Sequence, residues 1–269
     1  MFLRPDTIMI RNIVFDIGMV LIDFRWKQVM EDLGFPKEVI TFLDENFINA
    51  TTWQELDRGV MNTQEVLKIV QGRKKEYANY VMKFWEHIEE AIVAYDYAAP
   101  WLRELKERGF HIYLLTNYPD ELFAANELDR FPFIPYVDGA IVSSRVHFIK
   151  PEAQIYQSLL DTYQLKAEEC VFMDDRGVNV EGAKEMGLHA FVFNGHEDAK
   201  EKLEEIGHDD LLTSGLIEAV RYRIENLYDI NEAIDYIENN QRAINKMLKS
   251  LPKILEDSKG LQGLMKKHG

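Results

Sequence analysis

Residues 170–193 read CVFMDDRGVNVEGAKEMGLHAFVF. The apolar run Cys170–Met173 predicts a buried strand, Val178–Met186 predicts a helix, and His189–Phe193 predicts a second strand. A strand, a crossover helix and a strand in this order form the unit that joins two parallel strands of one sheet. This stretch therefore predicts an α/β fold.

The same alternation continues towards the N-terminus. Gly109 stands where a helix should end, between a predicted helix and a predicted strand. The further predicted elements are strands at Ile10–Phe15, His111–Leu115 and Ala140–Ser143 and helices at Trp101–Arg108 and Glu152–Tyr163. Such alternation predicts a Rossmann-like parallel sheet with helices on both faces.

Two regions depart from this alternation. Residues 23–97 carry apolar side chains at helical spacing, for example Val66, Ile69 and Val70, and we expect an all-helical insert there. Residues 213–269 are polar with one apolar helical face, and we expect a helical C-terminal extension that could support a homo-oligomer. The predicted domains are a core of residues 1–22 and 98–212, the helical insert of residues 23–97, and the extension.

Composition narrows the classes of function. The net charge of the 269 residues is −15, which disfavours nucleic acid as a partner because phosphate backbones are bound by clustered Lys and Arg. No apolar stretch approaches the roughly 18 residues of a membrane span, and the N-terminus lacks the pattern of a signal peptide. The single cysteine, Cys170, fits a reducing compartment. We expect a cytoplasmic protein without a membrane partner.

Polar side chains follow three of the predicted strands. Asp16, Thr116 and Asp174 each come directly after an apolar run. Ligands of parallel α/β sheets bind beyond the carboxyl ends of the strands, so we expect these segments to converge on one edge. That convergence is the main indication of function.

The first two segments suit phosphate chemistry, although each is weak alone. Asp16 ends a buried strand, and a tight turn at Gly18 would direct backbone amides into the same space. An Asp before a Gly also commonly marks an ordinary turn. Thr116 and Asn117 offer a hydroxyl and an amide for phosphate oxygens, or alternatively an ordinary helix cap.

The other two segments supply charge. Lys150 precedes Pro151 and could neutralise both Asp16 and a phosphate, although lone lysines are usually just solvated. Asp174 and Asp175 place two carboxylates at the tip of an apolar strand, and these hard oxygen ligands suit Mg²⁺. Two adjacent carboxylates repel unless a cation offsets them, which favours a metal site over a purely structural pair.

Taken in order, the four segments resemble the haloacid dehalogenase superfamily over about residues 10 to 207. The resemblance implies that Asp16 is a nucleophile that attacks phosphorus and that Thr116, Asn117 and Lys150 bind the phosphoryl group. It also implies that Mg²⁺ is held by Asp16, the Gly18 carbonyl, Asp174 and Asp175, and that the helical insert is a type 1 cap. The wording of the motifs is closest to sugar-phosphate phosphatases of the glucose-1-phosphate type, which implies hydrolysis of a small phosphorylated metabolite through an aspartyl-phosphate.

Position 18 departs from the family. Most of its phosphatases carry a second Asp two residues after the nucleophile as general acid and base, and here that residue is Gly18. Water, the substrate or a residue of the insert would have to replace it. Within the insert, Trp53–Gly59 could grip a polar leaving group, although a plain helix end explains it as well. Two alternatives stay open: a 2-haloacid dehalogenase, or a non-catalytic relative that only binds phosphate.

Overall fold

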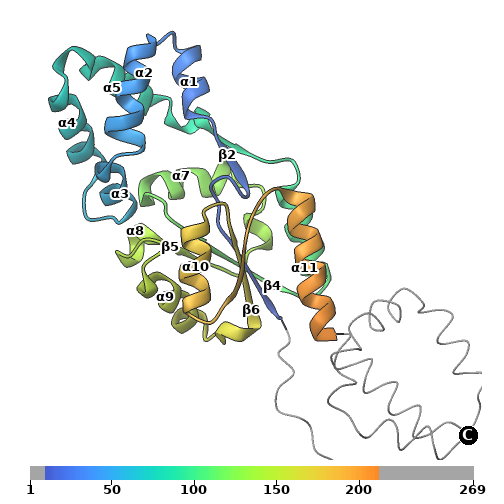
Figure 1. The fold of residues 1–269 in the computed structure, drawn as a ribbon. Coiled ribbons are helices and arrows are strands. Elements are labelled where there is room, and N and C mark those ends of the chain that lie inside the picture. Colours follow the sequence, from blue (N-terminus) through green and yellow to red (C-terminus); the bar gives the residue numbers. More distant parts are fainter. Residues whose placement is uncertain (1–9, 212–269) are drawn as a thin grey trace, which may run out of the picture. The chain divides into compact units, whose positions relative to one another are not determined.

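The computed structural model describes residues 10–211 of the chain. Its centre is a five-stranded sheet in the order β5-β4-β1-β6-β7, and every neighbouring pair in it is parallel (Figure 1). The strands are β1 Asn12–Phe15, β4 His111–Thr116, β5 Gly139–Val142, β6 Cys170–Asp174 and β7 His189–Val192.

Helices cover both faces of this sheet. They are α6 Ala98–Glu107, α7 Asp120–Asp129, α8 Ser143–Val146, α9 Ala153–Tyr163, α10 Gly177–Glu185 and α11 His196–Leu211. The alternation of side chains along each strand divides the core between the two faces. Val14 joins one cluster, whereas the ring of its neighbour Phe15 meets Trp101 of α6 edge-on at 5.0 Å.

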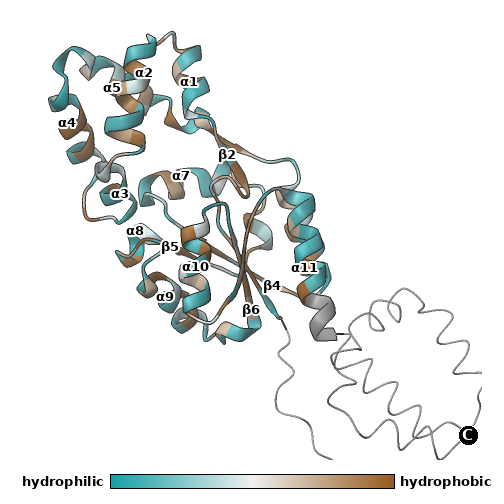
Figure 2. Cartoon of the chain, in the orientation of Figure 1, coloured by the Kyte–Doolittle hydropathy of each residue, from teal (hydrophilic) through white to brown (hydrophobic). Residues whose placement is uncertain are grey.

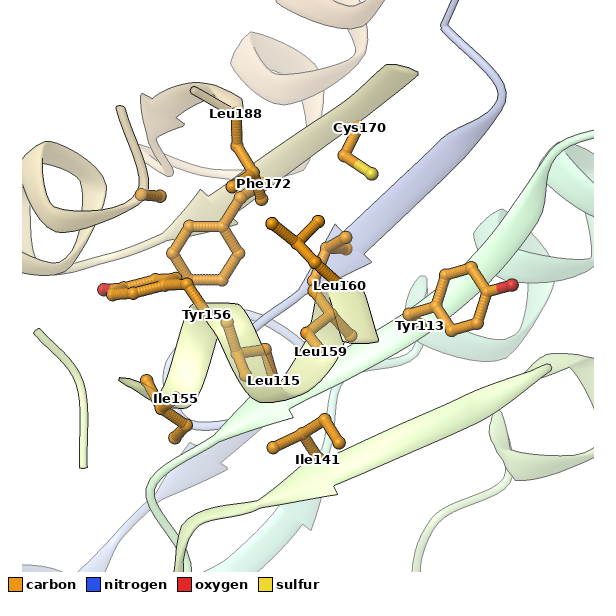
Figure 3. Close-up of a cluster of buried hydrophobic side chains, with 12 residues drawn as sticks. Tyr113, Leu115, Ile141, Ile155, Tyr156, Leu159, Leu160, Cys170, Phe172 and Leu188 are labelled. Carbon is orange, nitrogen blue, oxygen red and sulfur yellow. The ribbon is translucent and has the colours of Figure 1, made fainter. Parts of the chain in front are cut away.

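Figure 3 shows the cluster on the first of these faces, where α9 and α10 pack against the sheet. It contains the fully buried aromatic side chains of Tyr156 of α9 and Phe172 of β6, whose ring centroids lie 6.0 Å apart. Cys170 is buried in the same cluster as a free thiol. Figure 2 shows mainly hydrophobic residues along the strands and a mixture of hydrophobic and hydrophilic residues on α9 and α10, as expected of helices that bury one face against a sheet.

The helical insert leaves the sheet after β1 and returns before α6. It contains α1 Trp26–Asp32, α2 Lys37–Leu43, α3 Thr51–Asp57, α4 Thr63–Arg73 and α5 Ala78–Glu86. A two-stranded antiparallel ribbon joins it to the core, formed by β2 Ile22–Phe24 and β3 Ile92–Ala94. The helical spacing of the sequence did not predict this ribbon, because three-residue strands carry too little pattern to identify.

The predicted α/β fold is confirmed, and the strands and helices predicted from the sequence lie within a few residues of those observed. The predicted extension at residues 213–269 lies outside the described residues. Within residues 10–211, no helix combines the length and apolar character that a bilayer crossing demands.

Candidate active site

Three strand ends bring the predicted carboxylates to one edge of the sheet. Phe15, the last residue of β1, is paired with Leu114 of β4 and with Met173 of β6. Asp16 follows immediately, and its backbone amide donates a hydrogen bond of 3.0 Å to the carbonyl of Met173. The register of the parallel strands therefore sets Asp16 beside Asp174, although 158 positions separate them in the sequence.

Lys150 lies between these two aspartates and is almost completely buried. Its Nζ atom contacts Asp16 Oδ1 and Asp174 Oδ2 at 2.7 Å each, and it donates to the carbonyl oxygen of Leu115 at 2.8 Å. All three protons of the ammonium group therefore have acceptors. Burial alone would lower the pKa of Lys150, but Asp16 and Asp174 outweigh it and raise the pKa.

Asp174 is the carboxylate that the surrounding chain holds most completely. The Asn179 amide, in the first turn of α10, donates to both of its oxygens at 2.9 Å, and the backbone amide of Arg176 donates at 2.8 Å. The side chain of Asp174 is fully buried, whereas that of its neighbour Asp175 is exposed at the cavity edge. The two adjacent carboxylates thus differ: one is fixed inside the protein and the other faces the solvent.

Asp16 experiences strong desolvation. Burial raises the pKa of Asp16 from 3.8 to about 7, with Lys150 opposing the shift and Asp174 adding to it. The pKa of Asp175 is also raised, first by desolvation and then by the charge of Asp174. Three carboxyl groups stand beside one lysine here, and such an excess of acidic groups is the condition under which a bound cation stabilises a site.

The turn after Asp16 differs in one detail from the expectation. The left-handed residue is Met19, with φ 57°, and not Gly18. Gly18 lines the cavity, and a Cβ atom added to it would meet nothing within 4 Å. This conformation could not be predicted from the residue type, because a non-glycine residue rarely adopts positive φ.

The structure separates the two residues of the second segment. Thr116 ends β4 and is buried, and it is not among the residues that line the cavity, whereas Asn117 is. The Asn117 amide holds the backbone of Lys150, accepting from its N–H at 2.8 Å and donating to its carbonyl at 3.2 Å. Direct phosphate contacts by Thr116 and Asn117 stay predictions.

A cavity of ≈ 580 Å³ opens over this edge, between the sheet and the helical insert. The core contributes polar groups, among them Asp16, Asn117, Lys150, Asp175 and Asn179. The insert and the ribbon contribute mainly apolar and aromatic side chains, together with the polar groups Asn49, Gln54 and Asp57. The apolar and aromatic lining from these segments comprises Ile22, Phe24, Trp26, Ile48, Ala50, Trp53 and Ile92.

The end of α3 is docked onto the core beside the cavity. Arg58 and Glu152 form a bidentate ion pair with N–O distances of 2.7 and 2.6 Å. The Ser143 hydroxyl donates to the backbone carbonyl of Asp57. Gly59 has φ +69°, and a Cβ atom there would lie 2.3 Å from the carbonyl oxygen of Ser144. Only glycine allows so close an approach of the two backbones.

Two site residues have no individual role in the expectations from sequence. Asn179 stands in the quoted motif without a role, and Asp57 belongs to Trp53–Gly59, which fits either a contact with a polar leaving group or a plain helix end. The pKa of Asp57 is raised to about 8, first by burial and then by the charge of Asp16, while Lys150, Arg176 and a hydrogen bond from Trp53 act to lower it. The Oδ1 atom of Asp57 is buried without a hydrogen-bond partner among residues 10–211. Only the tertiary fold brings these side chains to the cavity.

Comparison with known proteins gives the same family as the motifs. Residues 10–187 match the family described as haloacid dehalogenase-like hydrolase. The chain is 26% identical to phosphatase MT3486 of Mycobacterium tuberculosis, over 68% of this chain and 87% of that protein. It is 24% identical to the D-ribitol-5-phosphate phosphatase of Bacteroides thetaiotaomicron, over 72% of this chain and 97% of that protein.

Two further matches support less, because one spans a small part of the other protein and the other has low sequence identity. Mouse bifunctional epoxide hydrolase 2 is 35% identical over 38% of this chain, but the match spans only 19% of that enzyme. A haloacid dehalogenase family enzyme of Bacteroides thetaiotaomicron, solved with magnesium and inorganic phosphate, superposes with a TM-score of 0.54 and 21% identity. That superposition covers 68% of this chain and 93% of the other. At this identity the likeness supports the fold alone.

Proposed function

Since the chain belongs to the haloacid dehalogenase-like hydrolases, we propose that it is a magnesium-dependent phosphatase that hydrolyses small phosphomonoesters through an aspartyl-phosphate on Asp16. The observation that carries the proposal is the pairing of Asp16 with Lys150 at 2.7 Å on the wall of a cavity. A carboxylate nucleophile and a buried cation at that distance are the groups that phosphoryl transfer requires.

The donor set fits magnesium. Asp16, Asp174 and Asp175 can each offer a carboxylate oxygen, and these atoms lie within 4.8 Å of one another. Mg²⁺ prefers hard oxygen ligands of this kind. In the proposed site these three residues and the Gly18 carbonyl would hold the ion. When bound, the ion would neutralise phosphate charge and polarise the phosphorus.

The chain's own residues perform the remaining steps. Asp16 attacks phosphorus in line with the leaving oxygen, which forms the aspartyl-phosphate and breaks the bond to the leaving group. Lys150 keeps Asp16 oriented and, together with Thr116 and Asn117, stabilises the charge on the transferring oxygens. Water then hydrolyses the aspartyl-phosphate. The helical insert covers the leaving group and limits the access of bulk water.

Sugar phosphates are the first substrate class we propose, as the motifs and the likeness to a ribitol-phosphate phosphatase favour. Asn49 and Gln54 supply polar groups on the insert side for hydroxyl contacts. The apolar lining favours a second class, phosphomonoesters with an aromatic or apolar leaving group, because desolvating such a group is favourable. We propose small-molecule substrates in a cytoplasmic setting.

The test is a phosphate-release assay on a panel of phosphomonoesters with Mg²⁺ and with EDTA. The panel contains hexose 1- and 6-phosphates, ribitol 5-phosphate, flavin mononucleotide and p-nitrophenyl phosphate. Asp16→Asn removes the nucleophile, and Asp23→Asn is its matched control because Asp23 pairs with Arg25 at 2.7 Å. We expect magnesium-dependent release that Asp16→Asn abolishes and Asp23→Asn retains.

Other outcomes point to the alternatives. Metal-independent halide release from a 2-haloacid, without phosphate release, would replace the phosphatase by a dehalogenase. Absence of both activities, and of any aspartyl-phosphate or fluoroberyllate adduct on protein that is still folded, would identify a non-catalytic relative that only binds phosphate.

A further inference from the structure

Cleavage of an alkyl phosphate leaves an alkoxide, which is a strong base and needs a proton as the bond breaks. Three carboxyl groups line the cavity among residues 10–211: Asp16, Asp57 and Asp175. Asp16 contacts Lys150, and Asp175 belongs to the acidic group that fits a cation. Gly18 has no side chain to offer. Asp57 is therefore the carboxyl group left to supply a proton, and it comes from the helical insert, which covers the leaving group.

We propose that Asp57 is the general acid that protonates the leaving oxygen. This proposal rests on the phosphatase function proposed above. In the first step Asp16 forms a bond to phosphorus, the bond from phosphorus to the leaving oxygen breaks, and the Asp57 proton moves to that oxygen. In the second step water attacks phosphorus, its proton returns to Asp57, and the bond from phosphorus to Asp16 breaks. Asp57 therefore ends the cycle protonated.

The surroundings of Asp57 keep its carboxyl group protonated and available. Its Oδ1 atom is buried and has no partner among the described residues, so the proton is not committed to another protein group. Burial raises the pKa of Asp57 to about 8, Asp16 adds to the shift, and Lys150 and Arg176 oppose it. Tyr118, whose own pKa is raised by burial and by Asp57, also faces the group and stays neutral.

The docked end of α3 holds Asp57 in place. The Ser143 hydroxyl donates to the Asp57 carbonyl and itself accepts from the Tyr118 amide at 2.9 Å. The neighbouring residue Arg58 binds Glu152, and its carbonyl lies 3.1 Å from the Nδ1 atom of His147. These contacts hold the backbone at residues 57 and 58, which limits how far the Asp57 side chain can move from the orientation that proton transfer requires.

The test compares two leaving groups in wild-type protein and in Asp57→Asn. An alkyl phosphate needs the proton, whereas p-nitrophenyl phosphate releases a weakly basic anion that does not. We expect Asp57→Asn to lower kcat/KM for the best alkyl substrate by about 10²- to 10⁴-fold and for p-nitrophenyl phosphate by less than about tenfold. Glu55→Gln is the matched control, because Glu55 lies on the same helix outside the cavity lining, and both substrates should be unaffected.

A second measurement uses wild-type protein alone. Donation needs the protonated acid, so kcat/KM for the alkyl phosphate should fall as pH rises through about 8, and p-nitrophenyl phosphate should lack this limb. An equal loss on both substrates in Asp57→Asn, or a shared basic limb, would overturn the proposal and assign Asp57 a structural role. Turnover by wild-type protein in either case keeps the phosphatase proposal intact, so the two failures are distinguishable.

Discussion

The two sides of the cavity hold their carboxyl groups differently. On the sheet side, Asp174 accepts hydrogen bonds from the side chains of Lys150 and Asn179 and from the backbone amide of Arg176. On the insert side, the Oδ1 atom of Asp57 has no hydrogen-bond partner among the described residues. Hydrogen bonds from three groups hold the Asp174 side chain in place, whereas burial is the main cause that raises the pKa of Asp57 to about 8. The sheet side therefore offers a fixed carboxyl group, and the insert side offers a carboxyl group that can carry a proton.

Substitution of Lys150, the buried cation on the sheet side of the cavity, should have the largest effect. Lys150→Met leaves Asp16 and Asp174 buried without their shared partner, and we expect a loss of about 3–5 kcal/mol in the free energy of unfolding. Phosphate release should fall by about 10²- to 10³-fold or more, because the transferring oxygens lose their cation. Urea denaturation and the phosphate-release assay measure the two effects.

The pH dependence of this variant has a definite sign. Lys150 lowers the pKa of Asp16, so its removal moves that pKa above about 7, farther from the ordinary 3.8. The unfolded chain then releases a proton that the folded protein keeps, and stability declines as pH rises from about 4 to beyond 7. Lys166→Gln, at an exposed lysine paired with Glu169, should change stability by less than about 0.5 kcal/mol. A similar loss of stability in Lys150→Met and Lys166→Gln would contradict the claim that the burial of Lys150 makes its removal costly.

Disturbing the docked end of the insert should have the next largest effect. Gly59→Ala forces an alanine to φ +69° and pushes its Cβ atom against the Ser144 carbonyl. Gly34→Ala is the matched control in the same insert, with φ +74° and no atom within 4 Å of the added Cβ. Both variants should lose about 1–2 kcal/mol in the free energy of unfolding, because alanine is forced into a left-handed backbone conformation. Gly59→Ala should lose about 1–3 kcal/mol more, because the added Cβ atom overpacks the contact with Ser144.

Activity separates these two variants as well. Gly59→Ala should lower kcat/KM for an alkyl phosphate, because the backbone beside Asp57 must shift, whereas Gly34→Ala should retain it. Equal stability and activity of the two alanine variants would show that the docking of α3 does not position Asp57.

The sheet side of the site was predictable from the sequence because it depends on local pattern. Apolar runs indicate buried strands, and parallel strands present their carboxyl ends at one edge, so Asp16 and Asp174 could be brought together without coordinates. Lys150 was predicted to neutralise Asp16, and the structure pairs it with both aspartates.

The insert side was not predictable for the opposite reason. The sequence Leu56-Asp57-Arg58-Gly59 is typical of an ordinary helix end. Contacts with residues far away in the sequence, among them the ion pair of Arg58 with Glu152 and the hydrogen bond from Ser143 to the Asp57 carbonyl, hold this segment at the cavity. The ribbon likewise pairs Ile22 with Ala94, 72 positions apart, through strands too short to carry a pattern. The positive φ of Met19 could not be inferred from its residue type, because a residue other than glycine rarely adopts this conformation.

A smaller loss of stability is expected on substitution of Asn179, whose side-chain amide donates hydrogen bonds to Asp174. Asn179→Ala removes the amide that donates to both Asp174 oxygens and should cost about 1.5–3 kcal/mol, the range for hydrogen bonds to charged groups. Gln157→Ala removes a similar amide from Asp161 at an exposed position and should stay within about 0.5 kcal/mol. Thermal unfolding of the two variants makes the comparison, and equal losses would contradict the role assigned to burial.

The smallest effect is expected for the ion pair that docks the insert. Arg58 and Glu152 are 24% and 33% exposed, so a double-mutant cycle with Arg58→Gln and Glu152→Gln should give a coupling of about 0.5–1 kcal/mol. The hydrogen bond from Arg58 lowers the pKa of Glu152, so this coupling should be present at pH 7 and decline below pH 4.5, where the carboxylate protonates. The exposed Lys184–Glu181 pair of α10 is the control, since it should show similar or weaker coupling and no change in KM. A rise in KM for Arg58→Gln without such a rise for Lys184→Gln would show that the pair acts on the cavity; unchanged KM in both would restrict it to stability.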